Sequence, residues 1–386
     1  MLREWLLDPA ITYLNHGTVG APPRRVLDAQ REIRDEIERQ PSRFLLRELT
    51  AISAGTPLAV PRLRQAAATV AAFLHADAGD LVFTDNATAG ANAVLQSFPL
   101  EPGDEILLSD LTYGGVANAA RFAARLRGAT IRVATIPCPF SSAGIARAFA
   151  DAVTPRTRLA VVDHISAESA VVFPLAEIAR MLREHGVAVL ADGAHAPGAI
   201  PLDVAATGVD WYVGNLHKWA WTPRSSGILW APPARQAGLH PPVISWGLDQ
   251  GFVPEFDLPG TRDPSAHLSA PAALSLMQAW DVDAIQRYNH NLAWQGALHL
   301  ASRWHVDFTT PEALIGTMAS VPLPERAGGT ADDARRLRAA LLDEDRIEVQ
   351  MHAYRGRLWA RISGQIYNDM DDVARLADAV GARIAG

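Results

Sequence analysis

Apolar and polar positions alternate along the middle of the chain in a way that predicts strands and helices in turn. Short apolar runs rich in β-branched residues are typical of buried strands, whereas apolar residues recurring every three or four positions indicate amphipathic helices. The pattern predicts strands at 105–109, 130–136, 159–162 and 187–191, with helices at 114–126, 145–153 and 175–184. Such strand–helix alternation indicates an α/β fold with a mainly parallel sheet covered by helices on both faces.

The character of the chain changes after residue 257. A long helical stretch at 270–302 is followed by short strands around Val306, Met318 and 347–351, with helices at 332–342 and 371–380. This mixture is typical of a smaller α+β unit. We therefore expect a large domain over residues 16–256 and a small domain formed by residues 1–15 together with 257–386.

Composition narrows the class of protein. A chain of 386 residues with 49% hydrophobic and 20% charged residues suits about two globular domains. The net charge of −7 argues against binding to nucleic acid or to an anionic membrane. The single cysteine, Cys138, excludes an internal disulfide and fits a reducing compartment. With no signal-like or membrane-spanning apolar run, we expect a cytoplasmic protein.

Two segments carry residues that suit one kind of chemistry. Asp192 and Gly193 follow a buried strand, at the edge where open α/β sheets bind ligands. This aspartate is either a partner for a cation or a helix N-cap. Further along, Lys218 follows a strand-like segment and lies beside two tryptophans, where partial burial would lower the pKa of its amine. Pyridoxal phosphate (PLP) requires such a pair, a carboxylate for its pyridine nitrogen and an amine that forms an imine.

The sequence around this pair resembles the class V aminotransferase family of fold-type I PLP enzymes, in particular its isopenicillin N epimerase type. The motifs are Asp192-Gly193-Ala194-His195, Asn215-Leu216-His217-Lys218-Trp219, Tyr13-Leu14-Asn15-His16-Gly17-Thr18-Val19-Gly20, Asn86-Ala87-Thr88, Gly260-Thr261-Arg262-Asp263-Pro264 and Arg361-Ile362-Ser363. They extend over nearly the whole chain. The resemblance implies a PLP-dependent transferase fold of type I, with a seven-stranded sheet in the large domain and a smaller α+β C-terminal domain.

The resemblance also implies catalytic and cofactor-binding roles. Lys218 would hold PLP as a Schiff base and remove the Cα proton of the substrate, while Asp192 would contact the pyridine nitrogen. Asn86, Ala87 and Thr88 precede a helical run, whose N-terminal N–H groups can bind the cofactor phosphate. A simple Asn or Thr helix cap is the alternative for this segment.

Five further residues are expected to contact the cofactor by resemblance. Tyr113 would stack on the pyridine ring, although a lone tyrosine is more often a core residue. His195 would lie beside the phenolic oxygen, and Asn215 and His217 would add phosphate contacts. Thr261 would reach the phosphate of a neighbouring subunit, which implies a homodimer with shared active sites; an ordinary loop threonine is the alternative.

The substrate is expected to be a small-molecule amino acid. Arg361, at the end of a strand-like run, is the candidate for binding its carboxylate, because a planar guanidinium binds a carboxylate through two hydrogen bonds. Asn15 could assist it, and Arg262 is either a second substrate-binding arginine or a surface residue. Ala167 and Glu168 depart from the family pattern, which has Ser or Asn and then Pro, so Glu168 could face either the substrate or the solvent.

The expected function is PLP-dependent chemistry at the Cα of an amino acid through a Lys218 Schiff base, by epimerisation or transamination. A C–S lyase acting by β-elimination is the alternative, and a non-catalytic PLP-binding protein is a third interpretation. Cys138 lies far from the late loop that carries the nucleophile of cysteine desulfurases, which argues against persulfide chemistry. No residue pattern in the chain distinguishes epimerisation from transamination or elimination.

Overall fold

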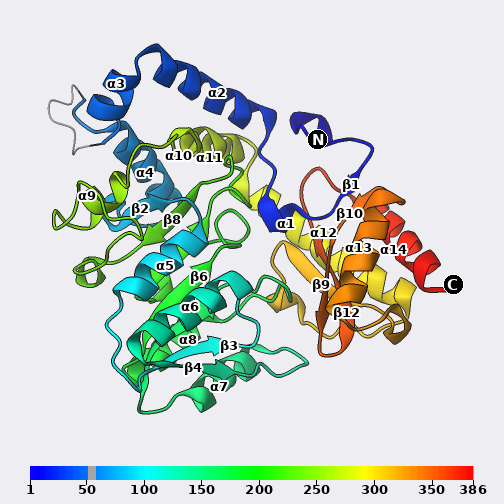
Figure 1. Ribbon diagram of the computed structural model, residues 1–386. Helices are drawn as coiled ribbons and strands as arrows, with labels where there is room; N and C mark the ends of the chain where they lie inside the picture. The colour runs from blue at the N-terminus through cyan, green and yellow to red at the C-terminus, as the bar shows by residue number, and fades with distance from the viewer. Residues whose placement is uncertain (51–57, 386) are drawn as a thin grey trace.

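A seven-stranded sheet forms the centre of the larger part of the molecule in the computed structural model, which describes residues 1–50 and 58–385 (Figure 1). In spatial order its strands are β2 (Leu81–Thr84), β8 (Gly227–Trp230), β7 (Trp211–Asn215), β6 (Ala188–Gly193), β5 (Thr157–Asp163), β3 (Glu105–Ser109) and β4 (Thr130–Ala134). Strand β8 runs antiparallel to both of its neighbours, and the other pairs are parallel. The expected mainly parallel seven-stranded sheet is therefore confirmed.

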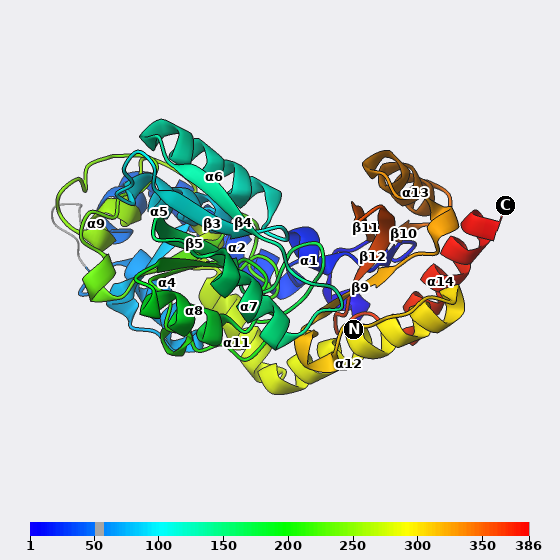
Figure 2. The same cartoon turned by 90° about the horizontal axis from the view of Figure 1, so that it is seen from below.

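Helices cover both faces of this sheet (Figure 2). Successive residues of a strand point to opposite faces, so each strand contributes to two hydrophobic cores. Leu108 and Val161 belong to the core beneath α5 (Ala87–Ser97) and α6 (Gly114–Arg127). The opposite face packs against α4 (Arg62–Phe73), α7 (Ser142–Ala152), α8 (Leu175–Glu184) and α11 (Ala270–Ala279).

A second, smaller sheet lies beside the first and is built mainly from the C-terminal part of the chain (Figure 1). Its antiparallel strands are β11 (Gln350–Tyr354), β12 (Arg357–Ser363) and β9 (Met318–Pro322), with β12 in the centre. The helices of this part are α12 (Val282–Trp304), α13 (Ala331–Asp343) and α14 (Met370–Ala385). In Figure 2, α12 runs from below the larger part to the smaller one.

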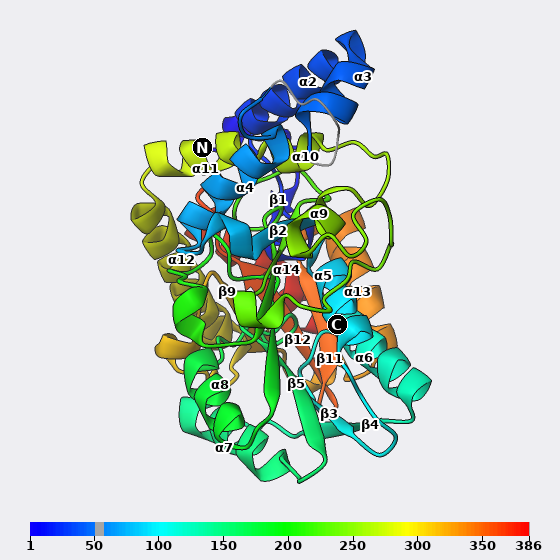
Figure 3. The ribbon, with the colours of Figure 1, turned by 90° about the vertical axis from the view of Figure 1, so that its left-hand side faces the viewer.

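The N-terminus joins this smaller part. Strand β1 (Thr12–Tyr13) pairs in parallel with β10 (Ile347–Glu348), and the short helix α1 (His16–Val19) then leads toward the large sheet. The remaining helices are α2 (Arg24–Arg39), α3 (Pro41–Arg43), α9 (Phe252–Asp257) and α10 (Ser265–Leu268). Figure 3 shows that α2 and α3 project beyond the rest of the chain. None of the helices in the described part of the chain is long and apolar enough to cross a membrane.

The strand expected around Val306 is wrong. His305, with a left-handed backbone (φ 54°), ends α12, and the N–H of Val306 donates to the carbonyl of Ala301 at 3.0 Å. This N–H closes the helix end and is not free to join a sheet. The helix expected at 270–302 is also divided in two, because Asp281 (φ 67°) ends one helix and caps the next by accepting from the N–H of Ala284.

Candidate active site

A cavity of about 450 Å³ opens at the edge where the parallel strands end. Its lining includes side chains that follow β3, β5, β6 and β7, together with the N-terminal end of α5 and one residue of β12. The residues predicted for the site that line it are Asn86, Ala87, Thr88, Tyr113, Asp192, His195, Asn215, His217, Lys218 and Arg361. Asn15, Thr261 and Arg262 do not line it.

Lys218, which follows β7, is the only lysine in the sequence. Its Nζ lies 3.1 Å from Nε2 of His195. Burial, followed by the charge of Arg361, lowers the pKa of the Lys218 amine to about 7, and the carboxylate of Asp192 opposes this change. A large fraction of the amine is therefore neutral at physiological pH, as a nucleophile or base requires.

The backbone at Lys218 is held by the N-terminal segment. His16 is fully buried, and its Nε2–H donates to the carbonyl of Lys218 at 2.9 Å while its Nδ1 accepts from the hydroxyl of Tyr367 at 2.9 Å. Burial lowers the pKa of His16 to about 4, so the ring stays neutral. Gly20, at φ 67°, packs so closely that an added Cβ would lie 1.8 Å from the carbonyl oxygen of His217. The structural roles of His16 and Gly20 were not predicted, although both lie in a quoted motif.

Asp192 is a buried carboxylate of the cavity that has both a hydrogen-bond donor and a cation beside it. The side chain is 3% exposed, and Oδ1 accepts from the N–H of Ala194 at 3.0 Å. Burial raises its pKa, whereas that N–H and the charge of Lys218 lower it. The carboxylate therefore lies ready to bind a further cationic group from the cavity.

The N-terminus of α5 presents an N–H group to the same cavity. Asn86 caps the helix, since its Oδ1 accepts from the N–H of Ala89 at 2.9 Å, and Oδ1 of Asn215 accepts from the N–H of Ala87 at 2.8 Å. The N–H of Thr88 has no acceptor within the described part of the chain, and Thr88 lines the cavity. A free N–H at a helix N-terminus favours an anion such as phosphate.

Arg361 contributes a buried guanidinium from the small sheet. It is 3% exposed, and it donates to the carbonyl of Ala167, to Oγ1 of Thr18 at 2.6 Å and to Oδ1 of Asn15 at 3.2 Å. Its buried Nε has no partner among the described residues. Burial lowers its pKa to about 10, so it remains a cation at neutral pH.

Asn15 lies behind Arg361 and orients it. Its Nδ2 donates to Oε1 of Glu348 at 2.7 Å, and it does not line the cavity. Thr18, for which the sequence predicted no role of its own, contacts Arg361 directly and lines the cavity. Sequence reasoning thus identified the arginine but missed one of the side chains that hold it.

The remaining predicted residues of the cavity occupy its walls. Tyr113 is the residue before α6 and is 48% exposed. His195 is 3% exposed, and in the described structure its buried Nδ1 has no hydrogen-bond partner. Nδ1 of His217 donates to the carbonyl of Ser226 at 3.1 Å, and burial lowers the pKa of His217 to about 4. Both histidines are therefore neutral near pH 7; the pKa of His195 is also lowered, chiefly by burial.

Thr261 and Arg262 line a different cavity, together with Asp257 and His267. Arg262 is nevertheless close to the first cavity. Its Nη1 lies 2.8 Å from Oδ1 of Asp85, a residue of the loop before α5 that lines that cavity. Within a single chain, Arg262 therefore pairs with Asp85 and is not placed to contact a substrate beside Lys218.

Comparison with the sequences of known proteins identifies the family of the chain. A family model described as Aminotransferase class-V matches residues 21–376. The chain belongs to the class V aminotransferase family. It is 32% identical over 396 residues to isopenicillin N epimerase of Streptomyces clavuligerus, covering 98% of this chain and 96% of that protein. It is 29% identical over 409 residues to L-cysteine desulfhydrase of Arabidopsis thaliana, covering 96% and 87%.

Solved structures show the same fold. A structure of the cystine C–S lyase C-DES with its reaction product cysteine persulfide has a TM-score of 0.78 at 24% identity, covering 97% of each chain. A C-DES variant with glycine covalently linked to its PLP cofactor has a TM-score of 0.79 at 24% identity, covering 100% of this chain and 99% of that one. The fold-type I architecture is therefore confirmed.

The cofactor of this class V enzyme is PLP, and the cavity fits it. The free N–H of Thr88 suits the phosphate, the buried carboxylate of Asp192 suits a protonated pyridine nitrogen, and the amine of Lys218 suits the aldehyde carbon. All three groups line one cavity. The chain is accordingly a PLP-dependent enzyme of the class V family.

Proposed function

We propose that this class V enzyme cleaves the C–S bond of a cysteine-like amino acid by β-elimination. The observation that carries the proposal is the chain's only amine side chain, that of Lys218, which lines the cavity with its Nζ 3.1 Å from Nε2 of His195; burial lowers its pKa to about 7, so it can take up and return a proton near neutral pH. Elimination needs one such group, because the base that removes the Cα proton can protonate the departing sulfur. Epimerisation needs a second acid on the opposite face of Cα.

The other residues of the cavity would orient the substrate and the cofactor. Arg361 would bind the α-carboxylate, since it is a buried cation with an unpaired Nε. Asp192 would keep the ring nitrogen protonated, and bound PLP supplies an electron sink for the pair left at Cα. His195, neutral and 3.1 Å from the amine, would keep Lys218 pointing into the cavity.

The named relatives support C–S bond cleavage. L-cysteine desulfhydrase of Arabidopsis thaliana is among them, as is the hercynylcysteine sulfoxide lyase of Schizosaccharomyces pombe, at 22% identity. The chain's cysteine, Cys138, is exposed and does not line the cavity. Sulfur would therefore leave with the product and would not be transferred to a cysteine of this chain.

Epimerisation is the second candidate, because isopenicillin N epimerase is also similar over nearly its whole length. Glu168 and Tyr113 line the same cavity as Lys218. These two side chains are the candidates for returning a proton to Cα in an epimerisation. The two candidate functions therefore differ in whether one or two groups exchange protons with the substrate.

A product panel tests the proposal. The PLP-loaded enzyme is incubated with L-cysteine, L-cystine and other L-amino acids, and pyruvate, ammonia, sulfide and D-amino acids are measured. We expect pyruvate and a sulfur product, and none from Lys218→Ala. Recovery of D-amino acid, or of a keto acid that keeps its side chain, would overturn elimination. Since Lys218 is the only lysine, borohydride reduction should attach PLP to one internal peptide of the wild type and to none of the variant.

We further infer that the enzyme is a homodimer in which Thr261 serves the phosphate site of the partner chain. The inference is supported by the position of Thr261, in a separate cavity whose neighbour Arg262 pairs with Asp85 at the edge of the first. Mixing Lys218→Ala chains with Thr261→Ala chains should restore activity after the subunits exchange, because one site of each heterodimer is intact. A fully active monomer in sedimentation would contradict this arrangement.

A further inference from the structure

Two buried carboxyl groups lie side by side at the edge of the sheet that forms the cavity. Asp163, the last residue of β5, is the register partner of Asp192 on β6. Neighbouring strands lie about 4.8 Å apart, and register partners point to the same face of the sheet. Both residues line the cavity, and they are 2% and 3% exposed. The mechanism above uses Asp192 and leaves Asp163 without a role.

The surroundings of the two groups differ. Asp192 has the N–H of Ala194 at 3.0 Å and the nearby cation of Lys218. Oδ1 of Asp163 accepts a long hydrogen bond of 3.4 Å from the N–H of Tyr113, while its buried Oδ2 has no partner in the described structure. No cation lies beside Asp163 among the groups that affect its charge.

Two adjacent buried carboxyls do not both ionise readily, because each charge disfavours the other in a medium of low dielectric constant. The proton is therefore expected on Asp163, which has no cation beside it and accepts a long backbone hydrogen bond of 3.4 Å, whereas Asp192 has Lys218 nearby and a shorter bond of 3.0 Å. The pKa values agree in direction: burial and the charge of Asp192 raise the pKa of Asp163 well above its usual range, although hydrogen bonds from Tyr113 and Thr112 lower it. The pKa of Asp192 is also raised by burial but is lowered by Ala194 and Lys218.

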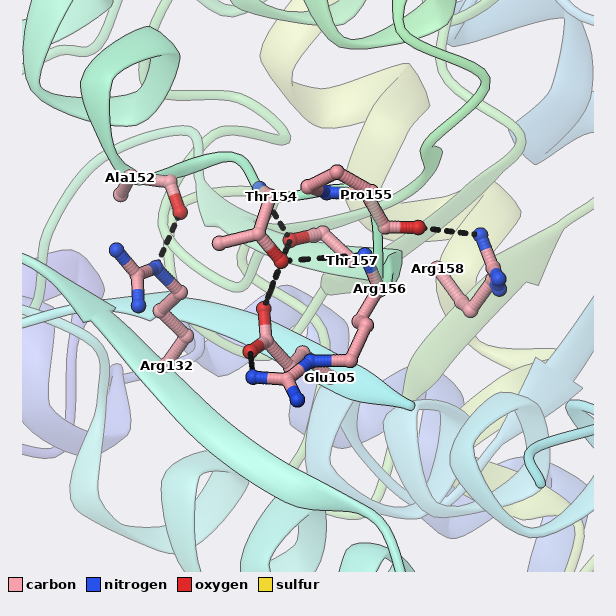
Figure 4. Close-up of polar contacts among 8 residues, drawn as sticks. All are labelled: Glu105, Arg132, Ala152, Thr154, Pro155, Arg156, Thr157 and Arg158. Atoms are coloured by element: carbon pink, nitrogen blue, oxygen red, sulfur yellow. Dashed lines mark hydrogen bonds and ion pairs between the residues drawn. The ribbon is translucent and has the colours of Figure 1, made fainter. Parts of the chain in front are cut away.

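A buried carboxylate at the opposite edge of the same sheet shows what a charged group requires. Glu105 is 4% exposed and accepts from Oγ1 of Thr154 at 2.5 Å, from Oγ1 of Thr157 at 3.2 Å and from Arg156 at 3.2 Å (Figure 4). These contacts, led by Thr154, lower the pKa of Glu105 despite its burial. Asp163 has neither an arginine beside it nor a donor to Oδ2, so its surroundings do not stabilise a negative charge.

We propose that Asp163 is a neutral carboxylic acid that positions Asp192: its Oδ2–H donates within the carboxyl pair, so that Asp192 alone carries the negative charge offered to the ring nitrogen. Its Oδ1 meanwhile accepts from the backbone of Tyr113 and so links the carboxyl pair to the cavity wall. The role rests on the PLP site and not on whether the reaction is elimination or epimerisation.

A neutral Asp163 also matters for Lys218. A second negative charge near Asp192 would stabilise the ammonium form of Lys218, because opposite charges a few ångströms apart raise the pKa of an amine. The amine would then be protonated at neutral pH and unable to act as a base. One charge is enough to hold the cofactor ring, and keeping the second carboxyl protonated preserves the low pKa of the amine.

The test compares two substitutions that separate charge from hydrogen bonding. Asp163→Asn is neutral and keeps a donor at the same position, whereas Asp163→Ala removes the donor. Glu105→Gln is the control, since it changes a buried carboxyl on a neighbouring strand far from the cavity. The readouts are the pH titration of the cofactor absorbance in the holoenzyme and the pH dependence of Lys218 labelling by an amine reagent after cofactor removal. The latter reports one internal site, because the chain has a single lysine.

We expect Asp163→Asn to keep both titrations close to those of the wild type. Asp163→Ala should shift the cofactor titration and weaken PLP binding several-fold, and Glu105→Gln should lower thermal stability without moving either titration. A decrease of about one pH unit or more in the Lys218 midpoint of Asp163→Asn would show that Asp163 is ionised and would overturn the proposal. Wild-type behaviour of Asp163→Ala would overturn the positioning role. If the variants do not fold, infrared spectra of the wild type labelled with ¹³C-aspartate decide whether a protonated aspartic acid is present at neutral pH.

Discussion

Replacing Lys218 by glutamine should make the cofactor-free enzyme more stable while abolishing its activity. In the folded chain the pKa of the amine is about 7, compared with 10.5 for an ordinary lysine. Between these values the unfolded chain holds a proton that the folded chain does not, so the free energy of unfolding rises with pH. Below about pH 7 the cost of placing an ammonium group in this site is fully present. A neutral glutamine removes that cost.

The pKa difference sets an upper bound on the gain. A shift of roughly 3.5 pH units corresponds to about 5 kcal/mol, at about 1.4 kcal/mol per unit. The substitution also disturbs the contact between Nζ and Nε2 of His195, which contributes about 1 kcal/mol, although a glutamine amide can replace part of it. We expect a net gain of up to about 4 kcal/mol at pH 7, or several degrees in Tm for a chain of this size.

The assay is thermal unfolding of the apoenzyme between pH 6.5 and 10, and the quantity compared is the difference between variant and wild type. Other titrating groups cancel in that difference, which should be largest near pH 7 and should vanish toward pH 10. Lys218→Arg is the matched control: its charge cannot be lost, so it should be less stable than the glutamine variant throughout. A glutamine variant that is less stable than the wild type at pH 7, or a difference independent of pH, would refute the reasoning.

Three further predictions concern single side chains of the cavity. Asp192→Asn should keep PLP bound but slow deuterium exchange at Cα by at least about 100-fold, since a neutral partner stabilises the protonated ring less; near-normal exchange would remove this role. Arg361→Ala should weaken binding of glycine, measured by spectral titration, roughly 100-fold, which corresponds to a loss of about 3 kcal/mol. Binding of glycinamide, which lacks the carboxylate, should change little. Equal losses for the two ligands would argue against carboxylate binding by Arg361. Glu168→Gln should reduce the preference for S-(2-aminoethyl)-cysteine over S-propylcysteine about fivefold in kcat/KM. The reason is that an exposed ion pair between Glu168 and the substrate's side-chain amine contributes up to about 1 kcal/mol. An unchanged ratio would show that Glu168 faces solvent.

Local patterns predicted β3, β4, β5 and β6 of the large sheet, whereas β2 and the antiparallel β8 were not predicted. The helix at 175–184 was predicted at its observed bounds, because a regular apolar face ends at Gly186, whose left-handed backbone (φ 71°) only glycine adopts easily. The strand at 105–109 was equally clear. The strand expected around Val306 was wrong because an apolar residue after a long helix can either join a strand or complete the helix end. The hydrogen bond from the N–H of Val306 to the carbonyl of Ala301 shows that it completes the helix end.

The site was predicted only as far as single motifs allow. Asp192 and Lys218 stand out because their residue types follow strands of one parallel sheet, whose ends meet at one edge. The contact of Lys218 with His16 and that of Arg361 with Asn15 join residues more than 200 positions apart, and no local pattern contains them. The same is true of the pairing between Asp163 and Asp192, which depends on strand register. Register, and not residue type, pairs Asp163 with Asp192 and makes it a candidate positioning residue.

Buried ionisable groups at the two edges of the large sheet differ in whether the fold stabilises their charged forms. At the edge near Glu105, the buried charge has three donors and its pKa is lowered, so the folded state gains from its ionisation above acidic pH. At the other edge Lys218 and Asp163 have pKa values displaced toward their neutral forms, and the buried Nδ1 of His195 lacks a partner in the described structure. Unpaired buried polar atoms destabilise a fold unless a ligand satisfies them. A cofactor that bonds to such atoms stabilises the folded chain by its binding free energy, so the same features that make the apoenzyme costly to fold favour a tightly held PLP.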